Sequence, residues 1–189
     1  MRRRRGLVLV VALAVVVAGL VGAAAAWATR YAPLGFTGGG VAPTPGLSFV
    51  DAAAGSGGRP VMFVPRGRRL VFLGFTLSNT GRVGVDVRGV DTSGFDGWLG
   101  FRPVALRAAA RRTAGEGEVP LRSAVAARSL HIPAGGARFV WVALRVPSCA
   151  NYTRDVTVSV SSVPLRFRYL GLLERTQAVE LPAGITLRC

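Results

Sequence analysis

The sequence predicts an all-β fold, an antiparallel β-sandwich, preceded by one N-terminal transmembrane helix. Four arginines, Arg2 to Arg5, stand directly before an unbroken apolar run from Leu7 to Trp27. From residue 60 onward, short apolar runs alternate with turn residues. We therefore expect a cytoplasmic arginine cluster and transmembrane signal-anchor helix over 1–28, a flexible spacer over 29–58 and the sandwich over 59–189.

The apolar run of residues 7–27 is long enough to cross a lipid bilayer. As a helix its 21 residues would reach roughly 31 Å, against a hydrocarbon core of ~30 Å. The arginines predict a cytoplasmic N-terminus and an extracellular C-terminal domain at the cell membrane. Ala26-Trp27-Ala28 also fits a signal-peptidase pattern, although the run exceeds the ~7–15 apolar residues of a cleaved signal. Cleavage after Ala28 would release a secreted protein, and this alternative stays open.

The segment 29–58 has the composition of a linker. It contains Gly38-Gly39-Gly40, two prolines and the stretch from Ala52 to Gly58, and few of its apolar residues recur at a fixed period. This composition favours a flexible spacer that lifts the domain off the membrane, with room for one short strand near 47–50.

Two strands at the start of the domain follow from strict alternation. Val71, Leu73, Phe75 and Leu77 fall on one face of an extended segment, and the turn residues Asn79-Thr80-Gly81 follow. The next run places Val83, Val85 and Val87 inward, with polar residues between them, as in a half-buried antiparallel strand.

The rest of the domain continues this pattern of short strands and turns. Further extended runs cover 98–106, 139–146, 156–160, 165–169, 179–181 and 185–187. Seven or eight strands of this length are typical of a β-sandwich. The stretch 104–112 is the one exported segment for which a helix stays open.

Two turn motifs resemble those of bacterial immunoglobulin-like modules. The strand ending at Leu77-Ser78-Asn79-Thr80-Gly81 is followed by Val83-Gly84-Val85, and Ile132-Pro133-Ala134-Gly135-Gly136 precedes the run 139–146. Together they are similar to the ectodomains of small membrane-anchored proteins from high-GC bacteria. The resemblance covers about residues 60–189 and implies an immunoglobulin-like sandwich. It departs from antibody domains, in which a disulfide joins two facing strands around a buried tryptophan.

The two cysteines predict one structural disulfide. Cys149 and Cys189 are the only cysteines, there is no CxxC motif, and His131 is the only histidine, so a redox or metal site lacks partners. A bridge between them closes a loop of about 40 residues, worth roughly 4 kcal/mol in the chain-entropy model, and needs an oxidising compartment. We expect it to fasten the last strand.

The charge is strongly positive and consists of arginine. The chain has 24 arginines, no lysine and a formal charge of +15. A GC-rich genome explains this bias, while a contact with anionic lipid or a cell-wall polymer remains an alternative. We predict no nucleic-acid partner, because the protein is exported and no basic stretch is interleaved with aromatic residues.

No residue pattern indicates catalysis, a cofactor or a metal. His131 lies in a strand beside a turn, Glu116 and Glu118 lie in a glycine-rich stretch, and the five-residue spacing of Asp86, Asp91 and Asp96 does not fit a calcium loop. We therefore predict a protein that is not an enzyme and has no cofactor.

The predicted function is contact with other proteins at the cell envelope. The alternative is an accessory domain that binds a cell-wall polymer or a small ligand through loops near Trp98 and the segment Arg102–Arg128, which holds six arginines against two glutamates. The candidate partner-binding residues are Arg107, Arg111, Arg112 and Trp98. Exposure of Trp98 would favour ligand binding, whereas burial of both Trp98 and Trp141 would favour protein contact.

Overall fold

The computed structural model describes residues 13–23, 26–27, 30–36, 41–50, 60–95, 99–109, 119–153 and 155–189. The chain divides into two compact units, residues 1–32 and 33–189, and each is described by itself. In the first unit, residues 13–23 are helical, and the rings of Trp27 and Tyr31 lie 4.8 Å apart. Among the described residues, no helix is both long and apolar enough to cross a membrane.

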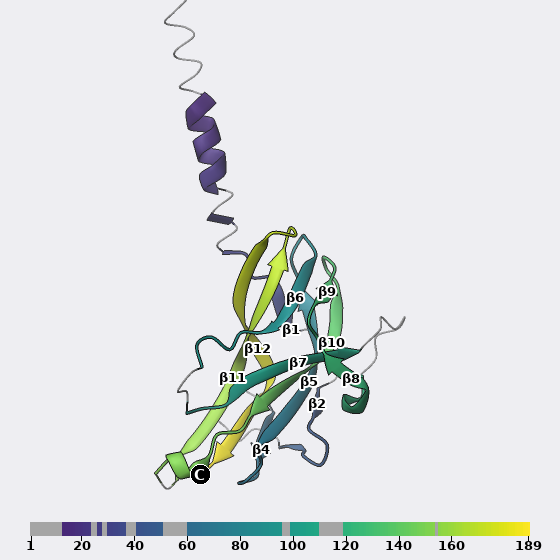
Figure 1. The fold of residues 1–189 in the computed structure, drawn as a ribbon, viewed down its shortest axis with the longest axis vertical. Helices are drawn as coiled ribbons and strands as arrows, with labels where there is room; N and C mark the ends of the chain where they lie inside the picture. Colours follow the sequence, from purple (N-terminus) through teal and green to yellow (C-terminus); the bar gives the residue numbers. More distant parts are fainter. Residues whose placement is uncertain are drawn as a thin grey trace, which may run out of the picture. The chain divides into compact units, whose positions relative to one another are not determined.

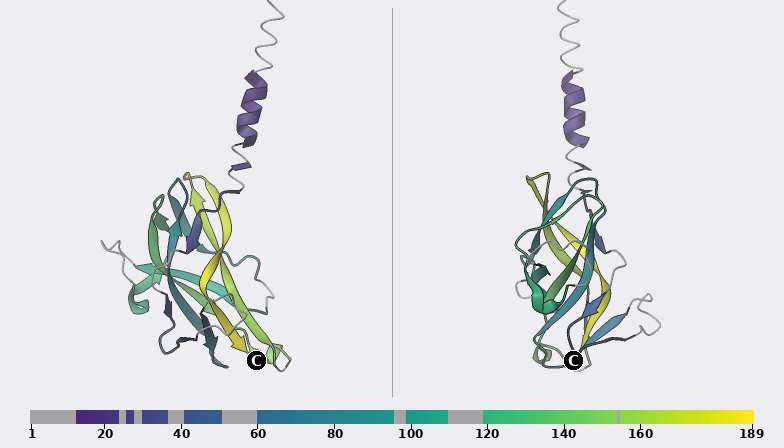
Figure 2. Two further views of the ribbon diagram at one scale, coloured as in Figure 1. Left: turned by 180° about the vertical axis from the view of Figure 1, so that it is seen from behind. Right: turned by 90° about the vertical axis from the view of Figure 1, so that its right-hand side faces the viewer.

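The second unit is a β-sandwich, which confirms the predicted all-β fold of two sheets (Figures 1 and 2). The first sheet has the order β1-β5-β10-β7-β8, and β2 also pairs with β5. The second sheet has the order β3-β4-β12-β11-β6-β9. The strands are β1 (Leu34–Phe36), β2 (Ala42–Pro43), β3 (Phe49–Val50), β4 (Val61–Val64), β5 (Leu70–Asn79), β6 (Val85–Val90), β7 (Arg102–Ala109), β8 (Ala124–Ala126), β9 (Leu130–Ile132), β10 (Ala137–Arg145), β11 (Thr157–Tyr169) and β12 (Leu173–Arg188).

Alternation of apolar and polar residues sets the face of each long strand. Every second residue of β5 points into the core, so that Val71, Leu73, Phe75 and Leu77 are each at most 1% exposed. Val85 and Val87 of β6 are buried in the same way. Facing strands of the other sheet contribute Leu165, Phe167, Tyr169, Val179, Leu181, Ile185 and Leu187. The predicted inward faces of 71–77 and of Val85 and Val87 are therefore confirmed, whereas Val83, also predicted to point inward, precedes β6 and is only half-buried.

One strand pairing departs from the predicted antiparallel arrangement. All described pairs of strands are antiparallel except β4 and β12, which run parallel, with Val61 opposite Gly184 and Val64 opposite Leu187. The long strand β12 thus pairs with β11 along most of its length and with β4 only near its C-terminal end.

Part of the predicted spacer belongs to the sandwich. The three short strands β1, β2 and β3 lie between residues 34 and 50, and the unit that contains the sandwich begins at Pro33 rather than at residue 59. Leu34 and Ala42 are buried because they pack against β5 and its neighbours, which lie far along the chain. Composition reports only local preference, so it missed these contacts. The residues 37–40 and 51–59 lie outside the described part.

A helix over 104–112, which the sequence allowed, does not form in the described part of this stretch. Residues 102–109 are strand β7, which pairs with β10 on one side and with β8 on the other. The alanines of this stretch permit a helix, but two sets of main-chain hydrogen bonds hold it extended. Residues 110–118 lie outside the described part.

Candidate interaction surfaces

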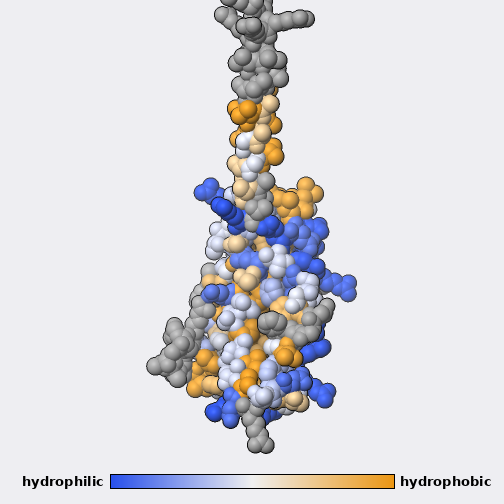
Figure 3. All heavy atoms as spheres, turned by 90° about the vertical axis from the view of Figure 1, so that its left-hand side faces the viewer, coloured by the Kyte–Doolittle hydropathy of each residue, from blue (hydrophilic) through white to orange (hydrophobic). Residues whose placement is uncertain are grey.

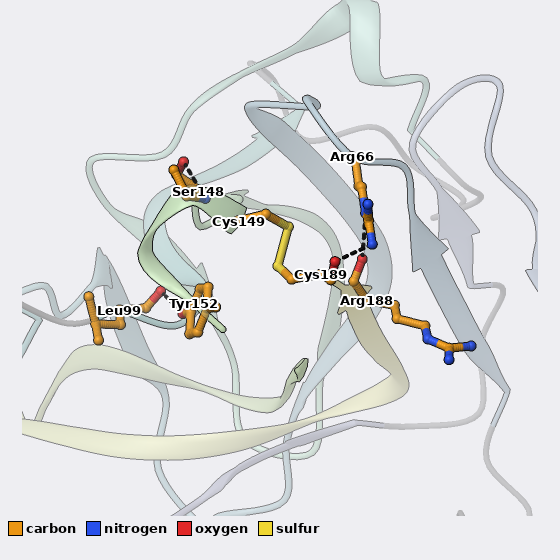
Figure 4. The surroundings of a disulfide bond; sticks show 8 residues. Arg66, Leu99, Ser148, Cys149, Tyr152, Arg188 and Cys189 are labelled. Atoms are coloured by element: carbon orange, nitrogen blue, oxygen red, sulfur yellow. Dashed lines mark hydrogen bonds between the residues drawn. A yellow bond between two sulfur atoms is a disulfide. The ribbon is translucent and has the colours of Figure 1, made fainter. Parts of the chain in front are cut away.

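The predicted disulfide is present and closes one end of the sandwich (Figure 4). Cys149 lies in a short 3-10 helix, Cys149–Asn151, between β10 of one sheet and β11 of the other. Cys189 follows β12, and the Cα atoms of the two cysteines are 5.2 Å apart. The bridge therefore fastens the end of the last strand to the connection between the sheets, as the sequence predicted.

Two further contacts secure this end. The Nε of Arg66 donates to the carbonyl oxygen of Arg188 at 3.3 Å, and another guanidinium nitrogen of Arg66 donates to the Cys189 carbonyl (Figure 4). The Tyr152 hydroxyl donates to the Leu99 carbonyl oxygen, and partial burial raises the pKa of this phenol. These bonds tie two further segments, around Arg66 and around Leu99, to the disulfide, which is a structural arrangement rather than a reactive one.

Trp141 lies in a second small core on the outer face of the first sheet. It is 3% exposed and packs with Ala42, Ala124 and Phe139. Its indole Nε1 donates to the Val119 carbonyl oxygen at 2.6 Å. Gly74 makes room for this core, because a Cβ at that position would come within 2.8 Å of the Phe139 ring. An indole covered in this way is a packing residue and presents no ring face to a ligand.

The structure describes only one of the four candidate partner-binding residues. Arg107 lies in the middle of β7, half-buried, with Trp141 and Ala126 as its partners in the two neighbouring strands. Trp98, Arg111 and Arg112 lie outside the described residues, as do Glu116 and Glu118. Residues 119–126 fold back over the first sheet, so part of the arginine-rich segment Arg102–Arg128 is built into the domain.

Charged side chains form a row across four strands of the second sheet. The strand register places His131, Asp86, Arg168 and Glu174 opposite one another in that order. The His131 Nδ1 lies 2.8 Å from an Asp86 carboxylate oxygen, and Arg168 lies 3.6 Å from Glu174. The His131 side chain is 60% exposed. The opposite charges of Asp86, Arg168 and Glu174 attract one another at neighbouring positions of the sheet, and His131 bonds to Asp86, so this row has a structural explanation.

The described acidic residues show no metal site. Within the parts of the chain described above, no three His, Cys, Asp or Glu side chains lie close enough together to hold an ion. Asp91 accepts hydrogen bonds from Thr176 at 2.6 Å and from the Ser93 hydroxyl at 2.7 Å. These bonds, that from Thr176 foremost, lower the pKa of Asp91 to about 2. Asp91 is therefore occupied in closing a turn, and Asp96 lies outside the described residues.

An exposed apolar turn between β11 and β12 was not predicted from the sequence. Leu170, Leu172 and Leu173 are 56%, 86% and 41% exposed. The signal for it was the run Tyr169-Leu170-Gly171-Leu172-Leu173, in which a hairpin turn is built of leucines instead of the usual polar residues. This leucine tip, residues 170–173, is the most apolar exposed turn in the described part of the sandwich.

No protein-family model and no curated protein matches the chain. Among solved structures, the chain is similar to the ASH/PapD-like domain 7 of human CEP192, with a TM-score of 0.29 and 9% sequence identity. That match covers 77% of this chain and 85% of the other.

Proposed function

We propose that this chain is a non-enzymatic, membrane-tethered protein of a high-GC bacterium whose extracytoplasmic immunoglobulin-like domain contacts other proteins at the cell envelope. The observation that carries the proposal is the Cys149–Cys189 disulfide, since such bridges persist in oxidising compartments outside the cytoplasm. The arginines before the apolar run of residues 7–27 supply the matching export signal.

Two structural findings support protein contact over ligand binding. Trp141 is buried and bonded to Val119, so it does not offer a stacking surface for a sugar or a small molecule, while Trp98, the other tryptophan of this criterion, lies outside the described residues. Part of the arginine-rich segment pairs with the first sheet, and Arg107 lies half-buried in β7 between Trp141 of β10 and Ala126 of β8. Arginine is enriched at protein interfaces.

Fractionation of the full chain expressed in a bacterial host tests the tether and the export. We expect the protein to resist carbonate extraction from membranes, to be cut by external protease, and to contain no free thiol. The control replaces Leu13 and Val17 by arginine, because two charges inside the run cost about 5–7 kcal/mol of membrane insertion. Recovery of the unaltered chain in the cytosol with two reactive thiols would contradict the proposal, and an intact mass would show whether Ala28 is a cleavage site.

Cross-linking followed by a pull-down from membranes tests the contact. The full chain should capture a protein, and a variant with Arg107, Arg111 and Arg112 changed to alanine should capture less of it. The alternative function predicts retention of the chain on purified cell-wall polymer or anionic lipid instead. An unchanged capture by the triple variant would remove the reason to assign the contact to this segment.

A further inference from the structure

We propose that the leucine tip between β11 and β12, residues 170–173, inserts into the interfacial region of an anionic lipid bilayer. This inference goes beyond protein contact, and its geometry rests on the proposed tether. It gives the domain a second attachment to the membrane, at a defined place on its surface.

The backbone of the tip shows that folding alone does not account for its leucines. Leu170 has a φ of 51° and Gly171 a φ of 70°, and Leu172 N donates to the Tyr169 carbonyl oxygen at 3.3 Å. Two central residues with positive φ define the hairpin turn that favours Asn-Gly. A leucine is disfavoured in this conformation, yet Leu170 is exposed and gains little packing in return.

The surroundings of the tip carry positive charge. Arg166, Arg168 and Arg175 lie in the strand ends next to the tip. Two acidic residues lie among them: Glu174, which pairs with Arg166 at 3.3 Å and with Arg168 at 3.6 Å, and Asp86, which lies opposite Arg168. Arg82 is exposed in the neighbouring turn before β6, whose first residue, Val85, is paired with Tyr169. The space-filling view shows hydrophobic residues next to strongly hydrophilic ones at this end of the domain (Figure 3). Leucines surrounded by arginines fit acyl chains and anionic headgroups respectively.

Within the second unit, the tip lies near the point where the chain enters the first strand, β1, at Leu34. Leu34 is bonded to Gln177, which precedes the tip by only four residues of β12, about 13 Å along the strand from Leu173. The disulfide and Cys189 lie at the opposite end of the domain (Figure 1).

The shape of the tip favours a bilayer over a protein pocket. The leucines lie in a narrow turn, and Leu172 has the most exposed side chain of the three. Tethering raises the effective concentration of the tip at the surface, so that a weak affinity is enough for occupancy. Burial of a single leucine is worth a factor of about ten or more in the docking equilibrium.

Quenching by brominated lipid tests the inference on the full chain. Leu172→Trp, in the exposed tip, and the control Val125→Trp, at an exposed position of β8, are each reconstituted in phosphatidylcholine–phosphatidylglycerol vesicles that carry brominated acyl chains. The signal of the unaltered chain is subtracted from both. We expect the tryptophan at position 172 to be quenched and that at position 125 not. A second change, Leu173→Glu, should lower the docked fraction of the tip about tenfold or more.

The lipid dependence and the flotation of the vesicles separate the outcomes. Quenching should weaken in pure phosphatidylcholine and in high salt, because both reduce attraction of the arginines. If the protein floats with vesicles but position 172 is quenched no more than position 125, the tip proposal fails and the tether stands. If the protein does not float, both fail. Photo-cross-linking of the tip to a protein in native membranes, without lipid quenching, would overturn the proposal in favour of a protein partner.

Discussion

Gln177 binds both main-chain polar groups of Leu34 with its side-chain amide. The Leu34 N–H donates to Gln177 Oε1 at 3.0 Å, and Gln177 Nε2 donates to the Leu34 carbonyl oxygen at 2.6 Å. The two residues are 143 positions apart, and they belong to different sheets. The Gln177 amide thus makes the two hydrogen bonds that a neighbouring strand would make with Leu34. It holds β1 of the first sheet against β12 of the second.

Replacing Gln177 by alanine should release β1. Two partly buried hydrogen bonds are lost, which predicts a decrease of about 1–3 kcal/mol in the free energy of unfolding. Gln177→Glu keeps an acceptor for Leu34 N–H but loses the donor. Its free energy of unfolding should therefore lie between those of Gln177→Ala and the unaltered chain. Denaturant unfolding and the amide exchange rate of Leu34 measure both effects. The exposed change Ala178→Ser is the control, and equal stability of all four proteins would contradict the assignment.

Removal of the disulfide should destabilise the domain without unfolding its sheets. The double change Cys149→Ser and Cys189→Ser opens a loop with a sequence separation of 40, for which the chain-entropy model gives about 4 kcal/mol. Urea unfolding of this variant should match that of the reduced protein. An unchanged midpoint would show that Arg66 and the packing of β12 hold this end without the bridge.

Asn79 should be one of the most sensitive polar residues of the sandwich. It is 1% exposed, and its Nδ2 donates to the carbonyl oxygens of Val83, Ile132 and Pro133 while its Oδ1 accepts from Gly81 N–H. Asn79→Ala leaves several buried groups without a partner and should cost about 3 kcal/mol. Asn79→Asp keeps the shape and the Gly81 bond but removes the donors, so it should be nearly as unstable. A loss below about 1 kcal/mol by thermal unfolding would show that water replaces the amide.

The contribution of Asp91 to the stability of the fold should depend on pH. Its folded-state pKa is lowered from 3.8 to about 2, first by the Thr176 hydroxyl and then by Ser93. A lowered pKa stabilises the fold above the unfolded value of 3.8, and this stability is lost as the pH falls from 3.8 towards 2. Thr176→Val should therefore be less stable at neutral pH and approach the unaltered chain near pH 2. NMR titration of the Asp91 carboxyl should show a higher pKa in the variant, and identical titration curves would refute the role of Thr176.

Changing Leu170 to asparagine should stabilise the domain. Asparagine tolerates the φ of 51° better than leucine does, and the gain should be about 0.5–1 kcal/mol. Thermal unfolding measures the gain, and Leu172→Asn, at a position outside the two with positive φ, is the control. If Leu170→Asn also weakens lipid quenching of a tryptophan at 172, then Leu170 lowers the stability of the domain and favours its contact with the membrane. A loss of stability would show that Leu170 is held by packing rather than strained.

The sequence predicted those parts of the fold that depend on local pattern. Alternation over Val71–Leu77 and Val85–Val87 was sufficient for two core strands, because one face of each is buried, while Val83 lies before the second strand and is only half-buried. Asn79-Thr80-Gly81 was sufficient for a turn, and two cysteines without a histidine partner were sufficient for a disulfide. The leucines of the tip can be read in the sequence, but their exposure cannot be predicted from it, because exposure depends on which residues the rest of the chain covers.

By itself the sequence determined the two-sheet β class, the disulfide pair and the N-terminal arginines followed by an apolar run. Only the tertiary structure decided that residues 34–50 join the sheets, that Trp141 is covered by residues 119–126, and that leucines 170, 172 and 173 remain exposed. Strands of two or three residues have almost no local preference for an extended backbone. They exist here because distant groups, such as the Gln177 amide at Leu34, complete their hydrogen bonds.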